Sequence, residues 1–117
     1  MNAAPLRFCA IVPAFREEKR IAGVVSRVRV HCPDVVVIDD GSGDGTAAVA
    51  EQAGAVVLRH AVNQGKGAAL NTGFRYAREQ KYEVLITLDA DGQHDPDEIP
   101  KFVEAYQRTG IPVLIGS

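Results

Sequence analysis

The segment Val35-Val36-Val37-Ile38-Asp39-Asp40-Gly41-Ser42 decides the fold, because it joins a run of β-branched residues directly to an acidic loop that contains glycine. A short, uniformly apolar run is typical of a strand that is buried on both faces. Residues 84–88 form a second apolar run of this kind, and it is also followed directly by an acidic residue, Asp89. Further apolar runs predict strands at 8–12, 56–58 and 113–115.

Apolar residues between these runs recur at positions i, i+3, i+4 and i+7, which is the pattern of a helix with one buried face. Asp44 is predicted to cap a shorter helix that begins near Thr46, and Gly54 to end it. Strands that alternate with helices predict an α/β, Rossmann-like domain. Its sheet is expected to be mostly parallel, with helices on both faces and a ligand site at the carboxyl ends of the strands. The predicted stripes are Ile21, Val24, Val25 and Val28; Leu70, Gly73, Phe74 and Ala77; and Ile99, Phe102, Val103 and Tyr106.

Composition narrows the class of protein further. The chain has 117 residues, 46% hydrophobic and 24% charged, which predicts a single globular domain. A net charge of −2 without a cluster of Lys and Arg disfavours a nucleic-acid partner. No apolar run approaches the roughly 20 residues that span a bilayer, and the first residues lack a signal-peptide pattern, so we expect a cytoplasmic protein without a transmembrane segment. Cys9 and Cys32 are expected to be buried thiols.

The loop Asp89-Ala90-Asp91-Gly92-Gln93-His94-Asp95 follows the strand predicted at 84–88. Two carboxylates at i and i+2 in a crevice repel one another, so a cation or protons must offset their charge. Oxygen ligands suit Mg²⁺ or Mn²⁺, which commonly bind one or two carboxylates together with substrate phosphates. The alternative is a solvated turn, because Asp and Gly are ordinary loop residues.

The loop after the strand at 35–38 has its own alternative. Asp40, Ser42, Asp44, Gly45 and Glu51 match positions 1, 3, 5, 6 and 12 of a calcium-binding EF-hand loop. An EF-hand needs a helix before the loop, whereas the preceding residues predict a strand, so calcium binding is disfavoured. We then expect a turn in which Asp39 or Asp40 is free to accept hydrogen bonds from a base or ribose.

Two further segments contain residues suited to a nucleotide. In Val12-Pro13-Ala14-Phe15-Arg16-Glu17-Glu18, Phe15 could pack on a base and Glu17 could accept a hydrogen bond from it; equally, Phe15 could be core and Glu17 a helix-terminal charge. In Asn63-Gln64-Gly65-Lys66-Gly67, a lysine that opens a helix could approach phosphate. The spacing fits neither a P-loop nor a Gly-x-Gly-x-x-Gly dinucleotide motif.

Together, these four segments resemble family 2 glycosyltransferases, which are inverting enzymes with a GT-A fold, and are most similar to the branch that transfers sugars to dolichyl and polyprenyl phosphates. The resemblance implies that a UDP- or GDP-linked sugar binds this chain with Mg²⁺ or Mn²⁺. Asp91 would be a direct metal ligand, with Gln93 second and Asp89 reaching ribose or a metal-bound water. Arg16 departs from the Asn usual at that place. The implied donor-binding residues are Pro13, Phe15, Glu17, Ile38, Asp40, Asp89, Ala90, Asp91 and Gln93.

The resemblance also implies parts that these residues do not supply. Family members usually carry acceptor-side groups later in the chain, so we expect 1–117 to be a single donor-binding domain, truncated at its carboxyl end. By resemblance, polyprenyl phosphate at the cytoplasmic membrane face is the expected acceptor. The strand at 113–115 is expected to leave an apolar sheet edge that favours self-association. A binding module without transfer activity would present the same loops, whereas a nucleotidyltransferase would need a glycine-rich signature that is absent.

Overall fold

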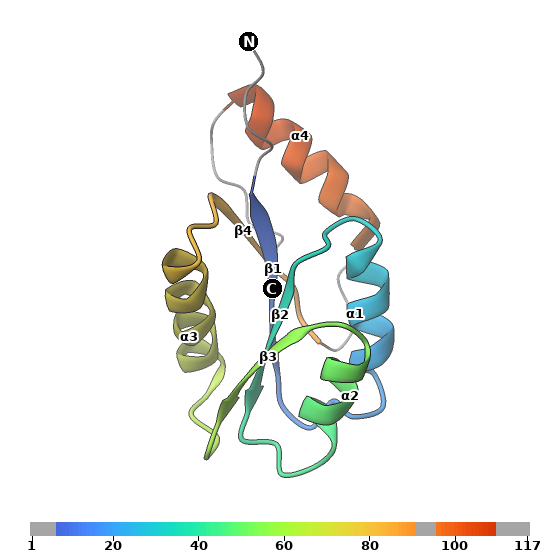
Figure 1. Ribbon diagram of the computed structural model, residues 1–117, viewed down its shortest axis with the longest axis vertical. Helices are drawn as coiled ribbons and strands as arrows, with labels where there is room; N and C mark the ends of the chain where they lie inside the picture. The colour runs from blue at the N-terminus through green and yellow to red at the C-terminus, as the bar shows by residue number, and fades with distance from the viewer. Residues whose placement is uncertain (1–6, 91–95, 110–117) are drawn as a thin grey trace.

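The computed structural model describes residues 7–90 and 96–109, which form a layered α/β domain (Figure 1). All strand pairs are parallel, and the strand order is β3-β2-β1-β4. The predicted parallel sheet is therefore confirmed, while the strand expected at 113–115 lies outside the described residues. The elements are β1 (Phe8–Ala14), α1 (Ile21–Arg29), β2 (Val35–Asp40), α2 (Thr46–Gln52), β3 (Val56–His60), α3 (Lys66–Glu79), β4 (Val84–Thr87), the 3₁₀ turn η1 (Pro96–Glu98) and α4 (Ile99–Thr109).

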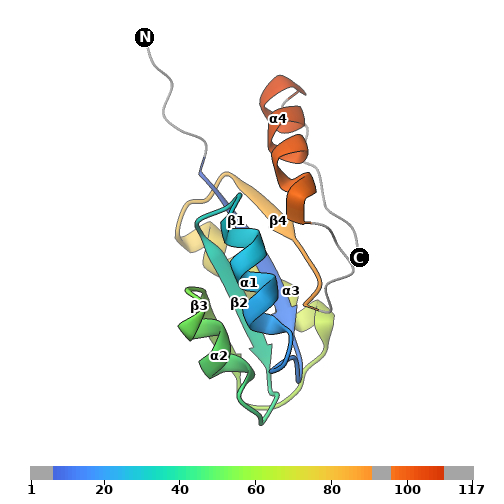
Figure 2. The same cartoon turned by 90° about the vertical axis from the view of Figure 1, so that its right-hand side faces the viewer.

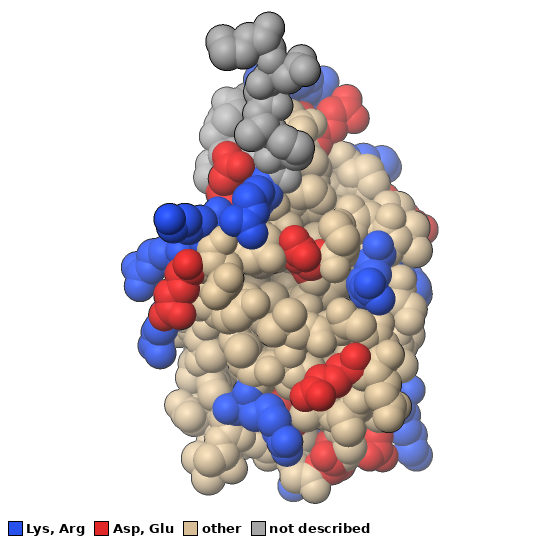
Figure 3. Space-filling view, viewed as in Figure 1, with Lys and Arg blue, Asp and Glu red and all other residues tan. Residues whose placement is uncertain are grey.

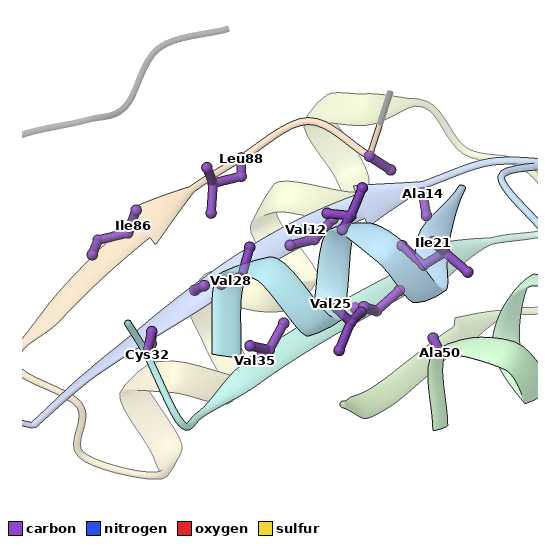
Figure 4. Close-up of a cluster of buried hydrophobic side chains, with 14 of the residues drawn as sticks. Val12, Ala14, Ile21, Val25, Val28, Cys32, Val35, Ala50, Ile86 and Leu88 are labelled. Atoms are coloured by element: carbon purple, nitrogen blue, oxygen red, sulfur yellow. The ribbon is translucent and has the colours of Figure 1, made fainter. Parts of the chain in front are cut away.

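Helices cover both faces of the sheet, as Figure 2 shows with α1 and α2 on the near side and α3 behind. On the first face, the predicted stripe of α1 packs against β1 and β2, and Ala50 of α2 and Ile99 of α4 join the same core (Figure 4). On the second face, Ala69 and Ala77 of α3 pack against β1 and β2. Burying both faces explains why β1 and β2 are apolar throughout rather than alternating.

The packing of α3 differs from the predicted stripe. Gly73 is buried as expected, but Phe74 is 37% exposed, and Ala69 takes its place against the sheet. A Cβ atom on Gly73 would lie 2.6 Å from Cγ2 of Ile11, so glycine allows the backbone of α3 to approach β1 closely. Small residues face the sheet on this helix because the gap left for side chains is narrow.

Several strand limits also differ from those expected. β1 continues through Pro13 and Ala14, which pair with Ile38 and Asp39, and β2 continues through Asp40. β3 is an edge strand on which Val56 is 45% exposed, so the expectation that every strand is buried on both faces is wrong for β3. An edge strand has a neighbour on one side alone, which leaves part of its surface in water.

The sequence also made predictions about the two cysteines and about the residues that begin and end α2. Cys9 and Cys32 are free and buried, and burial raises the pKa of their thiols to about 12 and about 11. Asp44 accepts a hydrogen bond from the Thr46 N–H at the start of α2 (2.9 Å), and Gly54 just after α2 has a φ of 105°.

No described helix is long and apolar enough to cross a membrane. In Figure 3, acidic and basic side chains are interspersed on the face shown.

Candidate functional site

A pocket of about 300 Å³ opens at the carboxyl ends of β1 and β4. The strand order reverses between these strands, because successive strands after β1 run to one side and β4 lies on the other. Ligands of open parallel sheets bind at such a switch point. The pocket therefore lies at the edge of the sheet where the sequence predicts a ligand site. Its lining residues are Pro13, Ala14, Phe15, Glu17, Asp40, Asn63, Gly65, Lys66, Ala69, Asp89 and Ala90.

The segment after β1 forms one wall of the pocket. Phe15 is 40% exposed, so it is a surface ring rather than a core residue. The Arg16 guanidinium lies 5.0 Å from the centre of that ring, and the Arg16 N–H donates to Oγ of Ser42 (2.8 Å). Arg16 has a φ of 55°, which is the left-handed region that Asn adopts more readily than Arg. The unusual Arg16 therefore combines backbone strain with a cation stacked on a pocket-lining ring.

Glu17 lies at the base of the same wall. Its N–H donates to Oγ1 of Thr46 (3.1 Å), which ties the segment after β1 to the start of α2. Its Oε2 is buried, has no hydrogen-bond partner among the described residues, and lies 3.6 Å from Nη1 of Arg20. A buried carboxylate oxygen with acceptor capacity remaining can receive a donor from a ligand.

The pocket is also lined by an ion pair between Lys66 and Asp89. Nζ of Lys66, the first residue of α3, lies 2.6 Å from Oδ1 of Asp89, which follows β4. The two side chains are 49% and 19% exposed, so the pair is open to solvent on the lysine side. An ammonium and a carboxylate at the pocket edge provide opposite charges that can bind an anion and a cation respectively.

Asp40 lines the pocket, but its carboxylate already has hydrogen-bond partners within the protein. It is the last residue of β2 and 4% exposed, and its carboxylate accepts hydrogen bonds from His60 Nδ1 (2.7 Å) and from Asn63, Gln64 and Gly65 (3.2, 2.9 and 2.8 Å). Burial raises the pKa of Asp40, but the hydrogen bonds outweigh burial and hold the pKa below its usual value.

These contacts correct the expectation that Asp39 or Asp40 is free to bind a base or ribose. A carboxylate has about four acceptor positions, and those of Asp40 are all used within the chain. Asp39 is 2% exposed and accepts from the Ser42 N–H (3.1 Å). Both residues belong to β2 rather than to the loop, which is why they are buried.

Ile38 is also placed differently from the expected base pocket. It is fully buried beneath α3, in the core that contains Cys9 and Ile11, and it does not line the pocket. Ile38 belongs to a central strand, and its side chain packs in the core beneath α3, so it supports the site through packing.

The EF-hand alternative is excluded by the element before the loop. Residues Val35–Asp40 form β2, so the entering helix of an EF-hand is absent there. Ser42 accepts from Arg16 and Asp44 accepts from Thr46, so both side chains stabilise the turn and α2.

The expected metal ligands Asp91 and Gln93, together with His94, lie outside the described residues. Within residues 7–90 and 96–109, no group of three His, Cys, Asp or Glu side chains could hold a metal ion. Asp89 does supply a carboxylate at the pocket edge, which is the hard oxygen ligand that Mg²⁺ or Mn²⁺ requires. The described part of the site therefore supplies one oxygen ligand of the kind that a divalent cation needs.

Sequence reasoning did not assign Asn63, Gly65, Lys66 and Ala69 to the donor site, although all four line the pocket. The segment 63–67 was singled out, but its spacing matched no phosphate-binding motif. The signal that could have included it is its position after β3, at the same edge of the sheet as the other loops.

Comparison with known proteins defines the class. The family model for glycosyl transferase family 2 matches residues 9–117, so this chain belongs to glycosyl transferase family 2. It is 35% identical to undecaprenyl-phosphate mannosyltransferase of Micrococcus luteus over 96% of this chain and 48% of the relative. It is also 35% identical to polyprenol monophosphomannose synthase of Mycolicibacterium smegmatis, over 95% of this chain and 44% of the relative. The chain thus spans less than half the length of these two relatives.

A solved structure supports the same fold. Glucosyl-3-phosphoglycerate synthase of Mycobacterium tuberculosis, in complex with Mn²⁺, UDP-glucose and phosphoglyceric acid, matches 90% of this chain and 40% of its own length. The TM-score is 0.71 and the sequence identity is 26%. The fold is therefore the GT-A fold of this family, as the sequence resemblance implied.

Proposed function

We propose that this chain binds the nucleotide-sugar donor of a glycosyltransferase that transfers the sugar to a polyprenyl phosphate. The observation that carries the proposal is the pocket at the switch point, which Phe15, Glu17, Lys66 and Asp89 all line. An aromatic ring and a carboxylate suit a base, and an ammonium suits a diphosphate. One pocket therefore combines contacts for both ends of a nucleoside diphosphate.

Each pocket residue has a defined role in this proposal. Phe15, 40% exposed, packs on the base, and Oε2 of Glu17, which has no hydrogen-bond partner among the described residues, accepts a hydrogen bond from the base or ribose. Lys66 opens α3, so its ammonium and the amino end of that helix both favour the negative diphosphate. Pro13 and Ala90 shape the pocket floor. Asp40 also lines the pocket, but its carboxylate is already saturated, so it supports the site through residues 63–65.

The proposal includes a divalent cation held by Asp91 and Gln93, with Asp89 reaching ribose or a metal-bound water. When bound, Mg²⁺ or Mn²⁺ would offset charge on the departing diphosphate. Support comes from Asp89 at the pocket edge and from the Mn²⁺ complex of the similar synthase. Lys66 adds a fixed positive charge beside the same phosphates, which neutralises the leaving group without needing a proton transfer.

The acceptor and location are proposed from the relatives. The similar transferases of Micrococcus luteus and Mycolicibacterium smegmatis are an undecaprenyl-phosphate and a polyprenol enzyme, so we infer a polyprenyl phosphate acceptor and action at the cytoplasmic membrane face. The donor base is inferred to be uracil or guanine.

Thermal unfolding with UDP, GDP and their sugar conjugates, with and without Mn²⁺, tests the donor site. A ligand that binds the folded state alone must raise the melting temperature, by an amount set by its concentration relative to Kd. We expect a metal-dependent rise with one of the two bases, and its loss in Asp91→Ala. Absence of a shift with every saturating nucleotide in the protein would contradict the proposal.

A binding module without transfer activity is the second candidate, because the same pocket would serve it. Incubation with the sugar nucleotide that binds and with polyprenyl phosphate separates the two. Formation of a sugar-linked lipid supports the transferase, whereas binding without product or donor hydrolysis supports the module.

A further inference from the structure

A chain of hydrogen bonds that begins at the pocket lining is not used by the donor contacts described above. It begins at Asp40, passes through the ring of His60, and ends on α3 at Thr72. His60 Nδ1 lies 2.7 Å from Oδ1 of Asp40, and its Nε2 lies 2.7 Å from Oγ1 of Thr72. The His60 side chain is 9% exposed, so both ring nitrogens are satisfied within the protein.

Through His60, this series of hydrogen bonds connects β2 and β3 to α3. His60 is the last residue of β3, and its backbone pairs with Asp40 in the sheet register. Thr72 lies one and a half turns into α3, which begins at Lys66. The imidazole thus links the carboxyl end of the sheet to the helix that supplies the pocket ammonium. This link adds a polar contact to the apolar packing that holds α3 against the sheet.

The Asp40 carboxylate, which accepts the hydrogen bond from His60, also accepts hydrogen bonds from the segment that connects β3 to α3. Oδ1 of Asp40 accepts the Gln64 N–H (2.9 Å), and Oδ2 accepts the Gly65 N–H (2.8 Å). Asn63 donates from its side chain to the Asp40 carbonyl oxygen (3.1 Å). Gly65 directly precedes Lys66, so these bonds fix the backbone from which the pocket ammonium projects.

Apolar packing contributes little to this connection. Val62 is 65% exposed, and residues 61–64 are all exposed. A segment with few buried contacts opens at low free-energy cost unless hydrogen bonds hold it. A Cβ on Gly41 would collide with the backbone of Val62 and Asn63, so the connection also lies directly against the end of β2. Asp40 and its partners are therefore the main attachment of the segment before Lys66.

We propose that His60 is a positioning residue for the donor diphosphate, acting through Asp40 and residues 63–65 on Lys66. This rests on the proposed donor site. The imidazole keeps the Asp40 carboxylate in the orientation that receives the Gln64 and Gly65 N–H groups, and anchors α3 through Thr72. With those bonds in place, the ammonium of Lys66 stays at the pocket edge beside Asp89. A displacement of the supporting groups by about 1 Å is enough to weaken such a contact substantially.

A double-mutant cycle between His60 and Lys66 tests the proposal, with Kd measured by calorimetry. The probes are UDP or GDP with Mn²⁺, whichever binds the wild-type protein, and the matching monophosphate. We expect His60→Leu to weaken diphosphate binding about tenfold, equivalent to about 1.4 kcal/mol, and to change monophosphate binding less than twofold. In the Lys66→Met background, His60→Leu should cause little further loss, because the residue through which it acts is already gone.

Additional variants separate positioning from general damage. His60→Gln retains one donor and one acceptor and should recover part of the diphosphate affinity. His31→Leu replaces a histidine that pairs with Asp97 instead, away from the pocket, and should leave both affinities unchanged. If His60→Leu does not fold, Thr72→Val removes the hydroxyl that bonds to His60 at nearly constant side-chain volume. It should also weaken diphosphate binding more than monophosphate binding, but by a smaller factor.

The outcomes distinguish this inference from the donor site itself. If neither UDP nor GDP binds the wild-type protein, the proposed function fails. If one binds, but the His60 and Lys66 losses are fully additive, or diphosphate and monophosphate are weakened equally, the positioning role is overturned and the donor site stands.

Discussion

Lys66 and Asp89 form an ion pair at the pocket, with Nζ 2.6 Å from Oδ1, although 23 residues separate them in the chain. Lys66 opens α3 on one side of the sheet, and Asp89 follows β4 at the switch point. The pair places a positive and a negative group where a diphosphate and its cation would lie together. It joins the two segments that the proposed mechanism requires to be close.

Replacing Lys66 should affect binding much more than stability. The ion pair is partly exposed, and such pairs contribute about 0–1 kcal/mol to folding. We therefore expect Lys66→Met to change the free energy of unfolding in urea by less than about 1 kcal/mol while weakening nucleoside-diphosphate binding. Lys101→Met, at an exposed position on α4, is the control and should change neither quantity. A large loss of stability with unchanged binding would show that the pair is structural.

Asp40 should contribute strongly to stability at neutral pH and weakly in acid. Its pKa is lowered in the folded state, so it stabilises the fold above the unfolded pKa of about 3.9, and this contribution disappears as the pH falls through the folded value. Asp40→Asn places an amide among backbone donors and should cost about 2–3 kcal/mol at pH 7.

The pH dependence of that difference is the check. Urea unfolding of the wild type and Asp40→Asn between pH 7 and pH 3 should show the difference shrinking below about pH 4. Glu104→Gln, an exposed change on α4, should show no such trend. A difference that stays constant down to pH 3 would contradict the role given to the Asp40 carboxylate.

Two glycines of α3 should respond oppositely to alanine. At Gly73 a Cβ would lie 2.6 Å from Cγ2 of Ile11 and 3.0 Å from Cδ1 of Ile38, so Gly73→Ala should destabilise the fold by about 1–3 kcal/mol. At Gly67 a Cβ would meet nothing within 4 Å, so Gly67→Ala should stabilise by about 0.5–1 kcal/mol through helix propensity. Thermal unfolding of the two variants measures both; equal effects would disprove the close approach of α3 to the sheet.

Arg16 should carry backbone strain that asparagine relieves. Its φ of 55° is costly for most L-residues, by about 1 kcal/mol, and less so for Asn. Arg16→Asn and Arg16→Ala both lose the cation over Phe15, so their comparison isolates the backbone. We expect the Asn variant to be more stable than the Ala variant by about 0.5–1 kcal/mol in chemical unfolding. Equal stability would indicate an unstrained backbone at position 16.

Local sequence patterns were sufficient to predict the elements of this fold. The stripe that begins at Ile21 is α1, and the apolar run from Val35 is a buried strand. The alternation of strands and helices predicted the parallel sheet and the edge at which the pocket opens. These features depend on periodicity and chain connectivity, which are properties of neighbouring residues along the chain.

The limits of the strands could not be predicted in the same way. The apolar run ends at Ile38, so the sequence predicts that Asp39 and Asp40 lie in a loop, but pairing with β3 extends β2 through both. Hydrogen bonds from His60 and from residues 63–65 offset the cost of burying Asp40. Those partners come from distant parts of the chain, so its burial depends on tertiary structure.

By itself, then, the sequence determined the α/β class, the family resemblance and six of the eleven residues that line the pocket, which are Pro13, Phe15, Glu17, Asp40, Asp89 and Ala90. Tertiary structure alone decided which of the acidic residues are saturated within the protein, and that Lys66 lies beside Asp89 at the pocket. The physical reason is that hydrogen-bond satisfaction and ion pairing depend on distances between groups in space. Periodicity along a chain specifies the faces of helices and strands but not those distances.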